Sequence, residues 1–197
     1  PLRRQRQMCI RDRFRVLIEK LNIPVLVHWN GMDVLENDHP LYMGRPGAVG
    51  QRAANFVLQN SDLLITIGTR LYLLQTGFNF AGYAKNAKHI MVDIDKAELD
   101  KPTLHPYMKV QCDAYEFITA LLNRNDLLKL NCESWIAKGK EWNAKYPSLN
   151  PLWLKDTKYI NSYYLLDEIS KQMTADDIYV GGRAGTCVDA TIQASNV

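Results

Sequence analysis

The stretch from Ser61 to Asp95 constrains the fold of this chain more than any other part of the sequence. It holds two short runs, Leu63–Ile67 (LLITI) and His89–Ile94 (HIMVDI), in which apolar residues mostly follow one another instead of alternating with polar ones. Continuous runs of this kind are typical of strands that are buried on both faces of a parallel sheet. A third run, Ile23–His28 (IPVLVH), has the same character. The three runs predict three strands of one sheet.

Segments with helical spacing separate these runs. Phe14–Leu21 and Gln51–Asn60 each place apolar side chains on one face, and Ala114–Asn123 does so after Asp113, a residue type that often caps a helix. Helices that alternate with buried strands predict an α/β fold. We therefore expect a doubly wound parallel sheet, Rossmann-like, with helices on both faces.

Further along, the sequence indicates a second unit. We expect residues 14–130 to form a central nucleotide-binding-like domain, and residues 131–160 to form a helix followed by a linker that contains prolines. Residues 161–197 show a helix, the start of a strand at Ile178–Val180, a glycine-rich turn and another helix. We interpret them as the truncated start of a second α/β domain, and the whole chain as a fragment of a larger enzyme.

The positive charge of the chain is concentrated in residues 1–13. This segment holds five arginines and a single acid, Asp12, and so carries more positive charge than the net +3 of the whole chain. A nucleic-acid-binding domain carries its basic residues on a folded face, so we expect no nucleic-acid partner. The segment lacks the apolar core of a secretory signal. It resembles the translation of a sequencing adaptor, and we expect an adaptor-like or disordered tail; a genuine basic tail is the alternative.

Several site classes are not expected from the sequence. No apolar run reaches the ~18 residues that a membrane-spanning helix needs. The four cysteines and four histidines show no metal-ligand spacing, so we assign no metal site. Free thiols without a signal sequence fit a reducing, cytoplasmic setting. There is no GxSxG, HExxH or Walker motif, so we assign no catalytic residue in this chain.

Polar and glycine residues follow the predicted strands, where ligands of open parallel sheets bind. Gly68 and Thr69 end the run Leu63–Ile67, and Arg70 offers a fork of donors that suits a phosphate. Asp93 could accept hydrogen bonds from ribose hydroxyls. Each residue also has a structural alternative: a tight turn at Gly68, an ion pair at Arg70 and local capping at Asp93.

Two glycines, Gly47 and Gly50, lie just before the helix predicted at Gln51–Asn60. Free N–H groups at the start of a helix can face an anion. The sequence therefore offers a second candidate position for a phosphate group.

Three further segments form a specific combination: GAVGQRAANFVLQNSDLLITIGTRL from Gly47, TGFNF from Thr76 and IMVDIDKAEL from Ile90. Together they resemble the middle domain of thiamine-diphosphate-dependent enzymes of the acetolactate synthase type, over roughly residues 14 to 124. Residues 161–197 resemble the opening of the C-terminal domain of the same family, which holds the diphosphate of the cofactor.

The resemblance implies a carboligase or decarboxylase of branched-chain amino acid biosynthesis that acts on a 2-oxo acid with thiamine diphosphate and Mg²⁺. Because the active sites of the family lie between subunits, it also implies a homodimer or homotetramer. In acetolactate synthases the middle domain binds FAD as well. Carried over to this sequence, the cofactor positions are Trp29, Asn30, Gly47, Gly50, Gly68, Thr69, Arg70, Asp93, Ile94 and Asp113 for FAD, and Gly185 and Thr186 for thiamine diphosphate.

The sequence departs from the family just after Arg70. Acetolactate synthases have an acidic pair and a second arginine there, whereas this chain has Tyr72, Leu73 and Leu74. A second hypothesis is therefore a non-catalytic nucleotide-binding or structural domain without bound FAD. The third, a nicotinamide-dependent dehydrogenase, requires a GxGxxG motif after the first strand, which the sequence lacks.

Overall fold

The structure is a computed structural model that describes residues 2–126, 129–155, 158–174, 177–178 and 185–195. The sheet is made of three strands, and the helices range from short single turns to the long N-terminal helix. In chain order the elements are α1 (Leu2–Leu21), η1 (Trp29–Val34), α2 (Arg52–Gln59), β1 (Leu63–Ile67), α3 (Leu73–Thr76), η2 (Phe80–Gly82), β2 (Lys88–Asp93), α4 (Lys96–Leu99), β3 (Met108–Gln111), α5 (Ala114–Leu122), α6 (Glu133–Lys145), η3 (Pro151–Lys155), α7 (Ser162–Gln172) and α8 (Thr186–Ala194).

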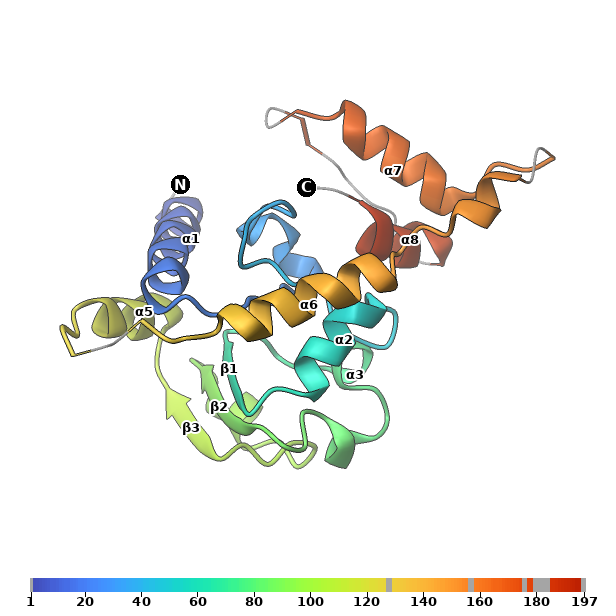
Figure 1. Ribbon diagram of the computed structural model, residues 1–197. Coiled ribbons are helices and arrows are strands. Elements are labelled where there is room, and N and C mark those ends of the chain that lie inside the picture. The colour runs from blue at the N-terminus through green and yellow to red at the C-terminus, as the bar shows by residue number, and fades with distance from the viewer. Residues whose placement is uncertain (1, 127–128, 156–157, 175–176, 179–184, 196–197) are drawn as a thin grey trace.

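The three strands form one parallel sheet in the order β1-β2-β3. In this sheet Ile65 of β1 lies beside Ile90 of β2, and Ile90 lies beside Met108 of β3. Helices α1 and α5 lie on one side of the sheet and α2 lies on the other (Figure 1). The predicted α/β fold with a parallel sheet is confirmed, and two of its strands lie within a residue of the predicted ranges.

The third expected strand, Ile23–His28, is wrong. Val25 makes only an isolated parallel bridge with Tyr42, in which the Val25 N–H donates to the Leu41 carbonyl at 2.8 Å and the Met43 N–H donates to the Val25 carbonyl at 2.8 Å. The apolar run exists because Val25 and Val27 are buried in the core. Burial alone does not distinguish a strand from an extended loop segment.

Strand β3 was not predicted from the sequence. Most of its side chains are exposed at the edge of the sheet, so Met108–Gln111 shows neither a continuous apolar run nor a buried face. An edge strand of four residues with this composition is recognised only from its hydrogen bonds to β2.

Helix α1 begins at Leu2, whereas periodicity predicted a start at Phe14. Residues 2–13, expected as an adaptor-like or disordered tail, are helical here, and Ile10 packs beside the buried Leu17. Arg11 also forms an ion pair with Asp33 of η1, and Arg15 forms one with Glu36, which follows η1. The origin of residues 1–13 stays a prediction.

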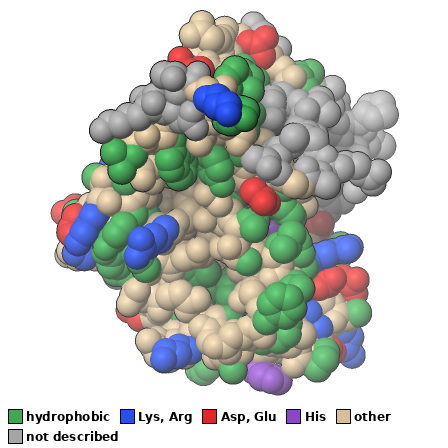
Figure 2. All heavy atoms as spheres, turned by 90° about the vertical axis from the view of Figure 1, so that its right-hand side faces the viewer, with side chains coloured by type: hydrophobic (Ala, Val, Ile, Leu, Met, Phe, Trp, Pro, Cys, Tyr) green, Lys and Arg blue, Asp and Glu red, His purple; other side chains and the backbone are tan. Residues whose placement is uncertain are grey.

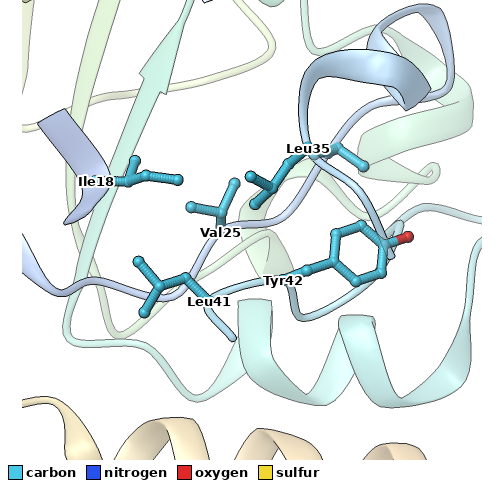
Figure 3. Close-up of a cluster of buried hydrophobic side chains, with 6 residues drawn as sticks. Ile18, Val25, Leu35, Leu41 and Tyr42 are labelled. Atoms are coloured by element: carbon cyan, nitrogen blue, oxygen red, sulfur yellow. The ribbon is translucent and has the colours of Figure 1, made fainter. Parts of the chain in front are cut away.

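Two apolar clusters join α1 to the rest of this domain. The first contains Ile18, Val25, Leu35, Leu41 and Tyr42, which lie around one another in Figure 3. The second contains Leu17, Leu21 and Ile118 of α5, with Ile67 of β1 packed against it. Helix α1 thus takes part in both clusters.

Three further helices, α6, α7 and α8, lie in residues 131–195, and the division of this part into a linker and a second domain stays a prediction. Helix α6 packs on α2, and Gly139 permits the close approach because a Cβ there would lie 3.3 Å from Val57 Cγ2 of α2 and 2.6 Å from the Met43 sulfur. Helix α7 packs on α8 (Figure 1). Of the strand start expected at Ile178–Val180 and the turn expected at Gly181–Gly185, only Ile178 and Gly185 lie inside the described residues. No helix of the described part combines the length and apolar character needed to cross a membrane.

Candidate functional site

Three aromatic side chains meet where the extended segment at Val25 ends. The Trp29 ring stacks on Tyr72 with ring centroids 5.5 Å apart and an angle of 28° between the rings. His28 contacts both rings edge-on, with centroid distances of 5.7 Å to Trp29 and 5.4 Å to Tyr72. We call His28, Trp29 and Tyr72 the aromatic niche.

The wall opposite these rings is the turn from Gly47 to Gly50. Gly47 has φ +137°, and a Cβ there would lie 2.7 Å from the Leu74 carbonyl oxygen. The Ala48 N–H donates to that same carbonyl at 2.7 Å, and the Asn55 amide bonds both the N–H and the C=O of Gly47 at 2.9 Å. Gly47 therefore permits the turn to pack on the segment after Tyr72. In this structure the glycine serves an internal contact.

Three polar atoms of the niche have no partner among the described residues. His28 Nε2, Trp29 Nε1 and the Tyr72 hydroxyl are buried and make no hydrogen bond there. His28 Nδ1 accepts from the Asn30 N–H at 3.4 Å, which assigns the ring proton to Nε2. Burial lowers the pKa of His28 to about 4 and raises the pKa of Tyr72. At neutral pH all three groups are uncharged hydrogen-bond donors.

The space between the niche and the turn is small. The hollow has a volume of about 240 Å³ including its open mouth, and Ile192 of α8 also lines it. Sites for drug-sized ligands measure roughly 300–1,000 Å³. The hollow, which Trp29 and Tyr72 line, is smaller than this, so the hollow itself does not fit a dinucleotide such as FAD.

At the carboxyl end of β1, unlike at the niche, the polar groups have partners nearby. Gly68 has φ +60°, and its N–H donates to the Val92 carbonyl at 2.9 Å. The Thr69 hydroxyl donates to Gln75 Oε1 at 3.1 Å, and Gln75 also lines the hollow, so this strand end borders the niche. The Arg70 side chain is 75% exposed, with Nε 3.6 Å from Glu98 Oε1, which is the ion-pair alternative named above.

At the ends of β2 and β3 the acidic residues close local turns. Asp93 accepts from the Asp95 N–H at 2.9 Å, and Asp113 accepts from the Tyr115 N–H at 2.9 Å as the N-cap of α5. Ile94 is 66% exposed. The local capping expected as an alternative for Asp93 is present, and a role of these residues in cofactor binding stays a prediction.

The structure thus sorts the cofactor positions predicted from the sequence into three places. Trp29, Gly47 and Gly50 lie around the hollow, with Asn30 beside them. Gly185 and Thr186 begin α8, and the side chain of Thr186 lies outside the described part. The others lie at the carboxyl edge of the sheet: Gly68, Thr69, Arg70, Asp93, Ile94 and Asp113.

Two further observations concern metal-binding and basic side chains. Among the described residues, no group of three His, Cys, Asp or Glu side chains is arranged to hold a metal ion. On the face shown in Figure 2, the described Lys and Arg side chains are scattered among hydrophobic and acidic ones without forming a continuous basic patch. Sequence reasoning named Tyr72 only as a departure from a family pattern, and it missed Gln75 and Ile192.

Comparisons with a family model and with known proteins point to the same family of enzymes. The model of the thiamine pyrophosphate enzyme central domain matches residues 6–121, a range that starts inside the segment expected as adaptor-like. The acetolactate synthase isozyme 1 large subunit of Escherichia coli (strain K12) is 36% identical over 110 residues, which cover 56% of this chain and 19% of that protein.

Two further relatives carry similar names. A probable acetolactate synthase large subunit of Methanococcus aeolicus is 44% identical over 85 residues, 43% of this chain and 14% of that protein. The acetolactate synthase large subunit of Corynebacterium glutamicum is 30% identical over 174 residues, 87% of this chain and 27% of that protein. The chain therefore spans well under a third of the length of these relatives.

Proposed function

Because this chain belongs to the thiamine pyrophosphate enzyme family and contains its central domain at residues 6–121, we propose that it is part of an acetolactate-synthase-like carboligase or decarboxylase. The observation that carries the proposal is that match, together with relatives that are named as acetolactate synthases. The substrate class is a 2-oxo acid such as pyruvate. The relatives do not favour the alternative of a non-catalytic binding or structural module.

Thiamine diphosphate supplies, when bound, the electron sink that 2-oxo acid chemistry needs. In this chain Gly185 and Thr186 are the residues that would approach its diphosphate. Gly185 has φ +66°, and a Cβ at this position would have no neighbour within 4 Å among the described residues. Helix α8 begins at Thr186, and free N–H groups at a helix start suit a phosphate. This local geometry supports the assignment.

In this proposal the central domain has a structural role: it holds α8, whose first turn would approach the diphosphate. Its sheet and α1 are packed together through the clusters around Ile18 and Ile118, and Ile192 of α8 lies beside the niche. Mg²⁺ is the ion proposed to accompany the diphosphate in the whole protein. FAD does not fit the hollow, so we propose that this domain works without a flavin.

The other properties proposed for the whole protein follow from the same family. The active sites of such enzymes lie between subunits, which supports a homodimer or homotetramer. A soluble small-molecule substrate supports a cytoplasmic location. Neither a nucleic acid nor a membrane is a proposed partner.

A domain exchange tests the proposal. Residues 14–124 replace the corresponding segment of a well-behaved acetolactate synthase, and acetolactate formation from pyruvate is measured with thiamine diphosphate and Mg²⁺. We expect the chimera to form acetolactate, since the inserted segment provides the same sheet and helices. The 197-residue chain by itself is expected to form none, because it carries no assigned catalytic residue.

A matched control is the same chimera with Gly47→Val. A Cβ at residue 47 would lie 2.7 Å from the Leu74 carbonyl oxygen, so this variant should lose the correct packing of the turn and most of the activity. A chimera that assembles like its parent and yet forms no acetolactate would contradict the proposal. Acetolactate formation by the isolated chain would contradict it as well.

A further inference from the structure

Helix α8 is held to the central domain at its C-terminal end by the side chain of Arg45. The two Nη atoms of Arg45 donate to three acceptors: the carbonyls of Ile192 at 2.9 Å and Ser195 at 3.0 Å, and Asn37 Oδ1 at 2.9 Å. Ile192 and Ser195 are 147 and 150 residues away from Arg45 in the sequence. These contacts therefore join two distant parts of the chain.

Arg45 is unusual because it is a fully buried charged residue. Its exposed fraction is 0%, and no ion pair with a carboxylate is recorded for it in the part of the chain that the structure describes. The C-terminal end of a helix carries partial negative charge and carbonyls without intrahelical partners. The carbonyls of Ile192 and Ser195 therefore accept the hydrogen bonds that a carboxylate accepts beside most buried arginines.

Further hydrogen bonds strengthen the same contact. Gln51 donates to the Gln193 carbonyl at 2.9 Å, and Gln193 donates in return to the Val49 carbonyl at 2.8 Å. Asn37 donates to the Ser195 carbonyl at 3.1 Å. We call Asn37, Arg45 and Gln51, with the last turn of α8, the Arg45 clamp. All of its central-domain members lie in or next to the segment that leads through the Gly47–Gly50 turn.

The other end of α8 is the turn at Gly185. A helix of nine residues is about 14 Å long, so the contacts that hold its last turn help to set the direction of the whole helix, together with the packing of α7 on α8. The first turn of the helix can be monitored separately, since the Val188 and Asp189 N–H groups both donate to the Gly185 carbonyl, at 3.0 Å and 3.3 Å.

We propose that Arg45 is a positioning residue that fixes α8 by its last carbonyls and so places the Gly185–Thr186 turn relative to the parallel sheet. The meaning of this placement for the cofactor depends on the function proposed above. The docking of α8 does not depend on it. The competing explanation is a purely local cap that orders only the last turn of the helix.

Amide hydrogen exchange of the 197-residue chain separates these explanations. Arg45→Met keeps the length of the side chain and removes its donors, and Arg52→Met is the matched control, because Arg52 stacks on Phe56 and Tyr146 and makes no recorded bond to α8. In Arg45→Met we expect exchange to become about 10- to 100-fold faster at Ser195 and by a smaller but clear factor at Val188 and Asp189. Exchange in β1 and β2 should stay close to that of the unsubstituted chain.

Arg45→Lys provides the rescue test, because a lysine restores the positive charge near the carbonyls but not the two-pronged donor geometry. We expect it to recover part of the protection along all of α8. If Arg45→Met does not fold, Arg45→Lys and Asn37→Ala carry the same test, since each removes only part of the clamp.

Faster exchange confined to Ser195 would overturn the proposal in favour of a local cap. Unchanged exchange in α8, or an equal loss of protection in α8 and the sheet, would also overturn it. These results are independent of the domain exchange. An inactive chimera with the expected exchange pattern would refute the enzyme assignment and leave the positioning role in place.

Discussion

The aromatic niche and the carboxyl edge of the sheet were both candidate cofactor positions, and they use their polar groups in opposite ways. At the edge, Asp93 and Asp113 each bond a backbone N–H two residues further along. At the niche, three buried polar atoms have no partner among the described residues, and at the adjoining Arg45 clamp several side chains bond a segment about 150 residues away. Local bonds stabilise single turns, whereas the long-range ones determine how two parts of the chain fit together.

The largest loss of stability is expected from a substitution in the Arg45 clamp. Arg45→Met should lower the free energy of unfolding by about 3 kcal/mol, because buried carbonyls lose charged donors without gaining access to water. Urea unfolding followed by far-ultraviolet circular dichroism measures this change. A loss below about 0.5 kcal/mol, the usual range for surface substitutions, would show that the clamp adds no stability.

At the niche itself, the ring of Tyr72 should matter and its hydroxyl should not. Tyr72→Ala removes the stack on Trp29 and is expected to cost about 2 kcal/mol, less than a fully buried aromatic residue because Tyr72 is only partly buried. Tyr72→Phe removes a buried hydroxyl that has no partner, so stability should stay unchanged or rise slightly. Equal losses in both variants would mean that the hydroxyl has an acceptor after all.

Acid should destabilise the niche and the body of the sheet, through one histidine in each; His89 lies near the amino end of β2, opposite the carboxyl edge. Burial lowers the pKa of His28 in the niche and of His89 in β2 to about 4, below their ordinary value of 6.5. The folded chain therefore binds fewer protons than the unfolded chain between these values, and stability falls as the pH drops from about 6.5 to 4. We expect a loss of about 1–2 kcal/mol from the buried His89.

His89→Gln, which keeps a polar group beside Thr66, should flatten this part of the pH profile. Thermal unfolding at several pH values between 4 and 7 provides the measurement. An unchanged slope in the variant would exclude His89 as a source of the pH dependence.

The cap at the edge of the sheet is expected to have a smaller effect. Asp113→Ala removes the bond to the Tyr115 N–H at the start of α5 and should cost about 1 kcal/mol. Asp113→Ser keeps an acceptor and should cost clearly less. Urea unfolding of the two variants, compared side by side, checks the difference, and equal losses would rule out capping as the reason.

The smallest effect is expected at the exposed end of the same edge. Arg70→Met should change the free energy of unfolding by less than about 0.5 kcal/mol, since the side chain is 75% exposed and its pair with Glu98 is screened by water. This is the same substitution as Arg45→Met, so the two variants compare the regions directly. A large loss at Arg70 would remove the contrast between them.

The sequence predicted those parts of the structure that depend on repeated apolar contacts. Buried runs located β1 and β2, and helical spacing located the second half of α1 together with α2, α5, α6 and α7. It failed at Val25, where a buried segment pairs with Leu41 and Met43 instead of joining the sheet, and at the exposed strand β3. Periodicity reports burial and does not report the pairing partner.

Prediction of the candidate site was limited for a related reason. Trp29, Gly47 and Gly50 were identified, and they do lie together around the hollow. Arg45 was missed because an arginine in a loop is ordinarily a surface residue, and its acceptors are backbone carbonyls that no residue type reveals. Only the folded arrangement of α8 shows why this arginine is buried.

The central claim is that this domain of a thiamine pyrophosphate enzyme fills its own niche with Trp29 and Tyr72 and works without a flavin. A titration of the purified 197-residue chain with FAD, followed by flavin and tryptophan fluorescence, tests it most directly. The account predicts a colourless protein and no change in either emission beyond that of a matched titration with free tryptophan. A yellow protein as purified, or saturable quenching of tryptophan emission by FAD that is lost in Trp29→Phe, would contradict it.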